Sequence, residues 1–91
     1  MSRQPRLDTA GALHHVMVRG IEGTDIFRTD QDRADFVARL AEQCESEALK
    51  VYAWALLSNH LHLLLRTGNL SISASMRKIL TGYAVRFNRR H

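Results

Sequence analysis

The chain has 91 residues, of which 45% are hydrophobic and 24% are charged, with one proline and five glycines. This length allows one small domain, and this balance excludes a disordered tail. No apolar run approaches the roughly 20 residues that span a bilayer, and no hydrophobic segment follows the first basic residues. We therefore expect a cytoplasmic protein with no membrane partner, formed by a flexible leader over residues 1–11 and a single domain over residues 12–91.

The charges divide the chain into two unlike halves. Residues 1–50 carry seven basic and nine acidic side chains, whereas residues 51–91 carry six basic and no acidic ones. A field of one sign in the second half suits a polyanion such as nucleic acid. A solvated basic face without such a partner is the alternative, and charge alone does not decide between them.

The first half predicts a strand and a helix. Residues 12–19 hold a short apolar run that stops at Gly20, as is typical of a strand, and a turn-rich loop follows. Within residues 30–47, apolar side chains recur at steps of three and four, which predicts a helix. Thr29 and Asp32 fit a capping box at the start of this helix.

The second half predicts a hairpin of two strands. Residues 51–57 are apolar on both faces, which predicts a strand in the middle of the sheet, covered on both sides. Ser58-Asn59 predicts a tight turn, and residues 60–66 alternate in character. In this second strand, one face receives Leu61, Leu63 and Leu65, and the other receives His60, His62, Leu64 and Arg66.

A last helix is predicted after a cap at Ser71 or Ser73. Its apolar stripe consists of Ile72, Met76, Ile79, Leu80, Tyr83 and Phe87. The order strand, helix, strand, strand, helix predicts an α+β fold, a ferredoxin-like βαββα core with an antiparallel sheet. A complete ferredoxin-like sheet has one more strand after the last helix. Without that strand the sheet keeps an open edge, along which a second copy could pair to form a homodimer.

His60 and His62 are the strongest candidates for a metal site. Two residues apart on a strand, their side chains emerge on one face about 6.5 to 7 Å apart, so that both rings can approach one ion. Neutral imidazole is a common metal ligand, and two such ligands leave positions for water or a phosphate. The alternative is that both histidines are packed or hydrogen-bonded without a metal. In the first strand, His14 and His15 point to opposite faces, so one of them can neighbour the site; the alternative for each is a structural role.

Four blocks of the sequence, residues 15–20, 26–28, 51–64 and 80–91, resemble successive blocks of the HUH-type tyrosine transposases. Within this group, the blocks resemble those of the REP-associated tyrosine transposases and related insertion-sequence transposases. The most specific block is the strand, turn and His-x-His pair, in which Ser58 stands where such proteins often have proline. The resemblance implies an HUH endonuclease fold that nicks and rejoins single-stranded or hairpin DNA.

The resemblance also implies a mechanism. A tyrosine hydroxyl attacks the scissile phosphate and forms a 5′-phosphotyrosine link, which stores the bond energy for rejoining, while a His-x-His pair holds Mg²⁺ or Mn²⁺. His60 and His62 match this pair. The family's tyrosine and a further metal ligand lie on a helix beyond the block at residues 80–91, so we expect this chain to lack the C-terminal strand and the tyrosine helix.

Tyr52 and Tyr83 are the two tyrosines of the chain. Tyr52 lies in the strand predicted to be buried, and Tyr83 lies on the apolar stripe of the last helix, where packing competes with a nucleophilic role. Two hypotheses stay open. Either the chain is an incomplete enzyme that binds DNA without nicking it, or Tyr83, or a helix exchanged from a partner chain, supplies the nucleophile.

Six basic side chains of the second half are candidates for contacts with DNA phosphates, which give affinity with little sequence information. They are Arg66 at the end of the histidine-bearing strand and Arg77, Lys78, Arg86, Arg89 and Arg90 of the last helix. A non-catalytic DNA-binding module and a small dimeric interaction domain are the competing functions.

Overall fold

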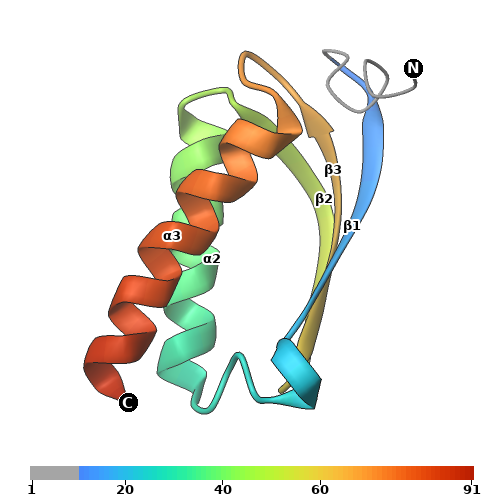
Figure 1. Ribbon diagram of the computed structural model, residues 1–91. Coiled ribbons are helices and arrows are strands. Elements are labelled where there is room, and N and C mark those ends of the chain that lie inside the picture. Colours follow the sequence, from blue (N-terminus) through green and yellow to red (C-terminus); the bar gives the residue numbers. More distant parts are fainter. Residues whose placement is uncertain (1–10) are drawn as a thin grey trace.

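The protein folds into two layers, an antiparallel sheet and a pair of helices (Figure 1). The computed structural model describes residues 11–91. In chain order these form β1 (Leu13–Arg19), the 3-10 turn η1 (Ile21–Gly23), α2 (Asp30–Glu45), β2 (Leu49–Leu56), β3 (His60–Thr67) and α3 (Ile72–Arg90). The predicted βαββα order is confirmed, and it is compatible with a truncated ferredoxin-like core.

The predicted leader over residues 1–11 lies outside the described residues except for Gly11. The N–H of Gly11 donates to the carbonyl of Thr67, at 3.0 Å. Within residues 11–91, no helix is both long enough and apolar enough to cross a membrane.

Both helices begin where the local sequence places their caps. The Thr29 hydroxyl accepts a hydrogen bond from the Asp32 N–H, and the Asp32 carboxylate accepts one from the Thr29 N–H, each at 3.1 Å. This reciprocal pair is the predicted capping box. In α3 the hydroxyl of Ser71 accepts from the Ala74 N–H at 3.1 Å. Each cap satisfies backbone donors that the first helical turn leaves without partners.

The strand order differs from the prediction in one respect. The order is β1-β3-β2 with both pairs antiparallel, so the predicted hairpin is confirmed. The prediction that residues 51–57 form the middle strand is wrong, because β3 occupies that place. β2 is an edge strand whose Tyr52 and Trp54 are 50% and 54% exposed.

A bulge in β2 explains the error. The pairing with β3 shifts register between Val51 and Ala53, so the alternation of faces is interrupted there. Beyond the shift, Ala53 and Ala55 pair with the open-face residues Leu64 and His62, respectively. Because these side chains are apolar, the sequence of β2 resembles that of a strand buried on both faces, although one face of β2 is exposed to solvent.

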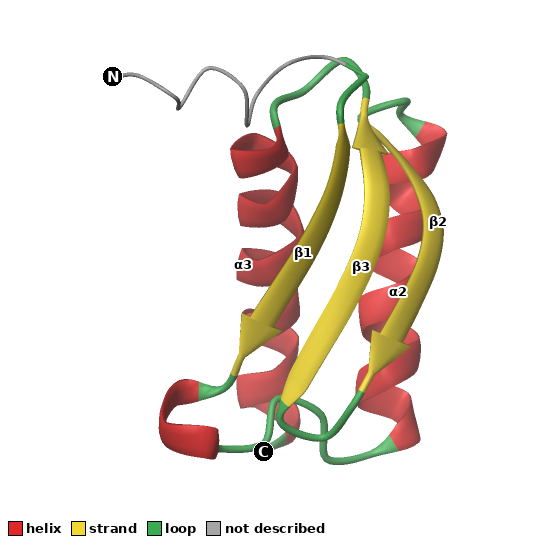
Figure 2. Cartoon of the chain, turned by 90° about the vertical axis from the view of Figure 1, so that its right-hand side faces the viewer, coloured by secondary structure: helices red, strands yellow, loops and turns green. Residues whose placement is uncertain are grey.

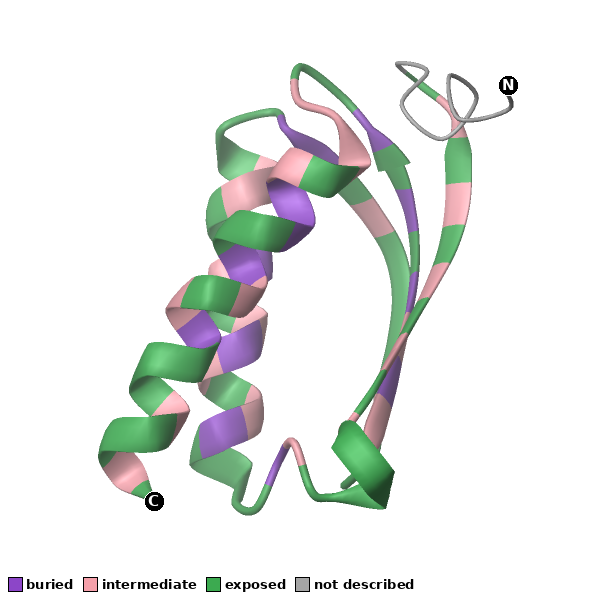
Figure 3. Ribbon diagram, in the orientation of Figure 1, coloured by how far each residue is buried: buried purple, intermediate pink, exposed green. Residues whose placement is uncertain are grey.

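The core lies between the sheet and the helices, which cover the same face of the sheet (Figures 1 and 3). From β3, Leu61, Leu63 and Leu65 enter this core and are buried. The other large buried side chains are Phe27, Phe36, Leu40, Leu49, Met76, Ile79 and Tyr83. Figure 2 views the sheet from its other side, where no described element covers the strands. We call this side the open face.

Candidate active site on the open face

The central strand sorts its side chains by face as the sequence predicts. The three leucines of β3 are buried, whereas His60 and His62 are half-buried and Leu64 and Arg66 are exposed on the open face. The rings of His60 and His62 lie with their centroids 5.2 Å apart and their planes nearly perpendicular, at 84°. The two histidines therefore stand on the central strand, which is paired on both sides and anchored in the core by its leucines.

The neighbouring strands surround this pair with residues that the register places opposite it. On β1, Met17 pairs with His62 and Arg19 pairs with His60; on β2, Ala55 pairs with His62. The two adjacent histidines of β1 face opposite ways, as predicted, and His15 shares the open face with His62. The Nε2 atom of His15 lies 3.1 Å from the Nδ1 atom of His62.

A shallow hollow of about 190 Å³ lies beside His62 on the open face. Its lining includes His15, Ala53, Ala55, His62 and Leu64. The hollow exists because alanines, rather than larger residues, stand on β2 next to the histidine. A ligand can therefore approach His62 from the side of β2.

The donor set fits a partial, open metal site. The Nδ1 atom of His60 lies 2.9 Å from Oδ1 of Asn59, and the Nδ1 atom of His62 faces His15. On each ring, Nε2 is the nitrogen that these contacts leave for an ion. Within residues 11–91, no three or more His, Cys, Asp or Glu side chains are grouped to hold a metal. The pair would thus supply two ligands, and the others would come from solvent, a phosphate or another segment.

Tyr83 lies on the other side of the sheet from His60 and His62. It is 7% exposed, packs against Phe27, Phe36 and Phe87, and donates a hydrogen bond from its hydroxyl to the Ile26 carbonyl. Burial, and next the negative charge of Asp32, raise the pKa of the Tyr83 hydroxyl well above its ordinary value. These contacts suit packing, because a nucleophilic hydroxyl needs access and a lowered pKa.

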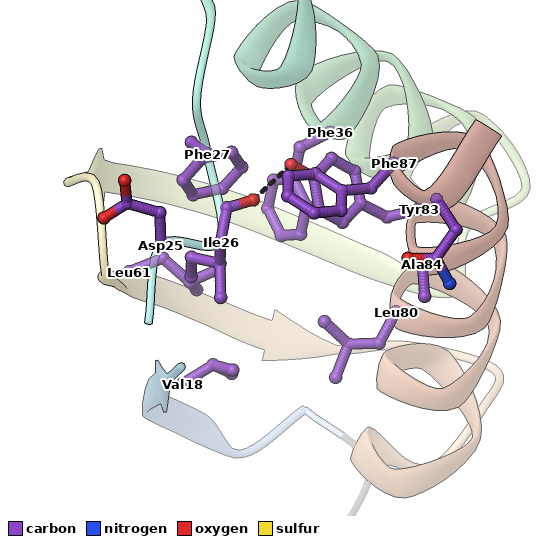
Figure 4. Close-up of a pocket in the computed structure, with 11 residues that line it drawn as sticks. Val18, Asp25, Ile26, Phe27, Phe36, Leu61, Leu80, Tyr83, Ala84 and Phe87 are labelled. Carbon is purple, nitrogen blue, oxygen red and sulfur yellow. Dashed lines mark hydrogen bonds between the residues drawn. The ribbon is translucent and has the colours of Figure 1, made fainter. Parts of the chain in front are cut away.

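Tyr83 also lines an apolar pocket of about 250 Å³ beside α3, shown in Figure 4. The dashed line in that view marks the hydrogen bond between Tyr83 and Ile26. Val18 and Leu61 line the same pocket from the sheet. Both side chains lie on the helix side, so this pocket is separated by the sheet from the histidine pair.

Tyr52 is not buried, contrary to the prediction from its apolar strand. It lies on the open face, where its hydroxyl accepts a hydrogen bond from Arg66 Nε at 3.3 Å and the guanidinium carbon is 6.0 Å from its ring centroid. Arg66 is six residues along β3 from His60, which corresponds to roughly 20 Å of strand. The open face thus carries the histidines at one end of β3 and the Tyr52–Arg66 pair at the other.

The six predicted DNA-contacting side chains do not form one surface. Arg66 lies on the open face, whereas the solvent side of α3, in the other layer, carries Arg77, Lys78, Arg86 and Arg89, all exposed. Arg90 is engaged in the protein itself. Its Nε lies 2.7 Å from Asp32 and its NH2 group 3.5 Å from Asp35.

Asp32 is fully buried where the start of α2 meets the end of α3. Burial by itself would raise its pKa, but hydrogen bonds from the Arg28 N–H, the Arg90 guanidinium, the His91 ring and the Thr29 N–H together hold the pKa well below its ordinary value. Arg90 therefore joins the two helices as the counter-ion of a buried carboxylate.

Two residues next to the histidine pair did not stand out as site residues in the sequence: Arg19 and Asn59. The signal that could have found Arg19 is the register of an antiparallel pair, since it lies directly opposite His60. That register can be worked out only when β1 is known to pair with β3, and no local sequence signal predicts this pairing.

In residues 11–91, two helices cover one face of an antiparallel sheet, and the central strand carries a His-x-His pair on its other face. A family model described as "Transposase IS200 like" matches residues 9–91. The chain therefore belongs to the IS200-like transposase family. No curated protein and no solved structure matches it.

Proposed function

We propose that this transposase-like domain acts in the cytoplasm on single-stranded or hairpin DNA, which lies across the open face. In this proposal His60 and His62 hold a divalent ion, Mg²⁺ or Mn²⁺, against a phosphate of the strand. The observation that carries the proposal is the half-buried histidine pair on the open face of the central strand, with the hollow beside His62 and Arg19 opposite His60. Membership of the IS200-like transposase family supports the class of reaction.

In this proposal the charged side chains have separate roles. A bound ion would polarise the phosphate it contacts. Arg19 and Arg66, at opposite ends of the open face, attract the backbone of the strand, and the exposed cations of α3 provide a second basic surface. Arg90 is assigned to the fold because its charge faces Asp32 and Asp35.

Strand cleavage by a tyrosine requires a hydroxyl beside the ion. A P–O bond forms to the tyrosine oxygen while the bond to the 3′ oxygen breaks, and that oxygen leaves as a hydroxyl. Neither Tyr52 nor Tyr83 lies next to the histidine pair. We therefore propose that residues 11–91 bind DNA and the ion, and that the nucleophile comes from another segment or from a partner chain that is not a second copy of these residues.

Titration with Mn²⁺ tests the metal pair. We expect the wild-type chain to bind the ion and the double variant His60→Ala/His62→Ala to lose binding while keeping its fold. His14→Ala is the matched control, since this histidine points toward the helices and should not affect binding. Equal binding by the wild type and the double variant would refute the site.

Incubation with a labelled single-stranded hairpin, followed by denaturing electrophoresis, tests the assignment of the nucleophile. We expect retention of the DNA under native conditions without a covalent adduct. An adduct that disappears in Tyr83→Phe but not in Tyr52→Phe would contradict the proposal and would make Tyr83 the nucleophile.

A second proposal concerns assembly. Within residues 11–91, the outer edges of β1 and β2 have no strand partner, and such edges can pair with another chain. We propose that a second copy joins along a sheet edge or by exchange of a helix. Light scattering over a range of concentrations tests this, and a monomer at all of them would contradict it.

A further inference from the structure

The side chain of Asn59 faces one ring nitrogen of His60. The two side chains meet with Nδ1 of His60 2.9 Å from Oδ1 of Asn59. An amide oxygen can only accept a hydrogen bond, so Nδ1 of the ring must be the donor. A neutral imidazole has one N–H, and Nε2 of His60 is therefore left with a free lone pair.

His15 makes the corresponding contact with His62. Its Nε2 atom lies 3.1 Å from Nδ1 of His62, and the two ring planes are nearly parallel, at 6°. The ring centroids are 5.2 Å apart, so the two nitrogens are much closer to each other than the ring centres are. When His62 donates from Nδ1, its Nε2 has a free lone pair. The reverse arrangement would place the proton on Nε2 and prevent it from binding an ion.

We propose that Asn59 and His15 are positioning residues that hold His60 and His62 in the Nδ1–H form, with both Nε2 atoms available to one metal ion. This inference rests on the proposed function, which assigns the ion to this pair. A hydrogen bond at the second ring nitrogen fixes the tautomer and orientation of a metal-binding histidine, and its loss typically weakens metal binding about 10- to 100-fold.

The backbone around Asn59 does not depend on its side chain. The carbonyl of Asn59 accepts from the Gly20 N–H at 2.9 Å, and the Leu57 N–H donates to the His60 carbonyl at 2.9 Å. The second of these bonds closes the β2–β3 turn, and the first joins the turn to the residue after β1. Asn59 and His15 are also exposed, so replacing either should leave the fold intact.

The tautomers can be measured on the metal-free protein, and the measurement needs no activity assay. Long-range ¹H–¹⁵N NMR spectra of the metal-free chain at neutral pH should show His60 and His62 protonated at Nδ1. Asn59→Leu should move His60 alone toward the Nε2–H form, whereas Asn59→Asp, which keeps an acceptor oxygen, should not. His15→Phe should move His62 alone, and His15→Gln, which offers an amide oxygen near the same place, should preserve it. Unchanged tautomers in Asn59→Leu and His15→Phe would overturn the inference.

Mn²⁺ titration of the same variants supplies the second readout. Asn59→Leu and His15→Phe should each bind Mn²⁺ about 10- to 100-fold more weakly than the wild type, and Asn59→Asp and His15→Gln should stay close to it. Equal affinities in all five proteins would overturn the inference. A wild-type chain with the expected tautomers that fails to bind Mn²⁺ would instead refute the proposed metal role and leave the hydrogen-bonded positioning established.

Discussion

The two faces of β3 use alternate residues of one strand for different purposes. Leu61, Leu63 and Leu65 are buried against the helices, whereas His60 and His62 are only half-buried on the other side. Apolar burial stabilises the fold, and partial exposure leaves imidazole nitrogens available to a ligand. We therefore expect substitutions on the open face to cost little stability and substitutions on the helix-covered face to cost much more.

The two tyrosines repeat this contrast. Tyr83 is enclosed by aromatic rings and hydrogen-bonded to a backbone carbonyl, whereas Tyr52 is half exposed beside Arg66. The same residue type, tyrosine, is therefore buried on the helix side of the sheet and solvent-exposed on the open face. The following predictions test that division by measuring the free energy of unfolding, from the largest expected change to the smallest.

Leu63→Ala should have the largest effect. Removing a fully buried leucine side chain typically costs about 2 to 5 kcal/mol, through lost burial and the cavity left behind. Chemical denaturation followed by circular dichroism measures this change. Leu64→Ala, at the next position but on the open face, is the control and should cost much less. Similar losses in the two variants would mean that the faces are not different.

Asp32→Asn should destabilise the fold by about 2 kcal/mol, because a buried carboxylate with charged hydrogen bonds loses its charge. Since the folded pKa of Asp32 lies below its ordinary value of 3.8, this stabilisation is present above that pH and is lost as the pH falls below it. The difference between the wild type and the variant should therefore shrink on acidification below about pH 4.

Asp30→Asn is the control for this experiment, because the Asp30 side chain is fully exposed and its ion pair with Arg33 is long, at 3.7 Å. A pH-independent difference between the wild type and Asp32→Asn would show that the charge of Asp32 is not what joins the helices.

Tyr83→Phe should cost about 1 kcal/mol, the usual net value of one hydrogen bond, because the Ile26 carbonyl loses its donor. Mn²⁺ binding should not change, since Tyr83 lies across the sheet from the histidines. Tyr52→Phe on the open face should leave stability nearly unaltered. The assignment of Tyr83 to packing fails if its variant is as stable as the wild type but loses Mn²⁺ or DNA binding.

Ala55→Leu should have the smallest effect on stability, within about 0.5 kcal/mol, because it enlarges a side chain at a solvent-exposed position. The larger side chain would fill the hollow beside His62, so the affinity for a single-stranded oligonucleotide should fall. Fluorescence anisotropy measures this affinity, with Ala34→Leu on the exposed side of α2 as the control. Unchanged affinity in Ala55→Leu would exclude the hollow from the DNA-binding surface.

Local signals in the sequence were sufficient for most of the elements. The capping box of Thr29 and Asp32, the cap at Ser71 and the alternation in residues 60–66 involve residues a few positions apart, so their physics is complete within the segment. The same alternation placed His60 and His62 on one face. The strand order was less accessible, because alanines and a bulge removed the contrast between the faces of β2.

The sequence by itself therefore determined the elements, the face shared by the histidines, and the resemblance that the family match confirmed. The tertiary structure decided what surrounds those residues. It placed His15 beside His62 across 47 positions and Arg90 beside Asp32 across 58, and it put both helices of residues 11–91 on the same face of the sheet. Such contacts depend on which strands and helices become neighbours, and that outcome follows from packing the whole core rather than from any one segment.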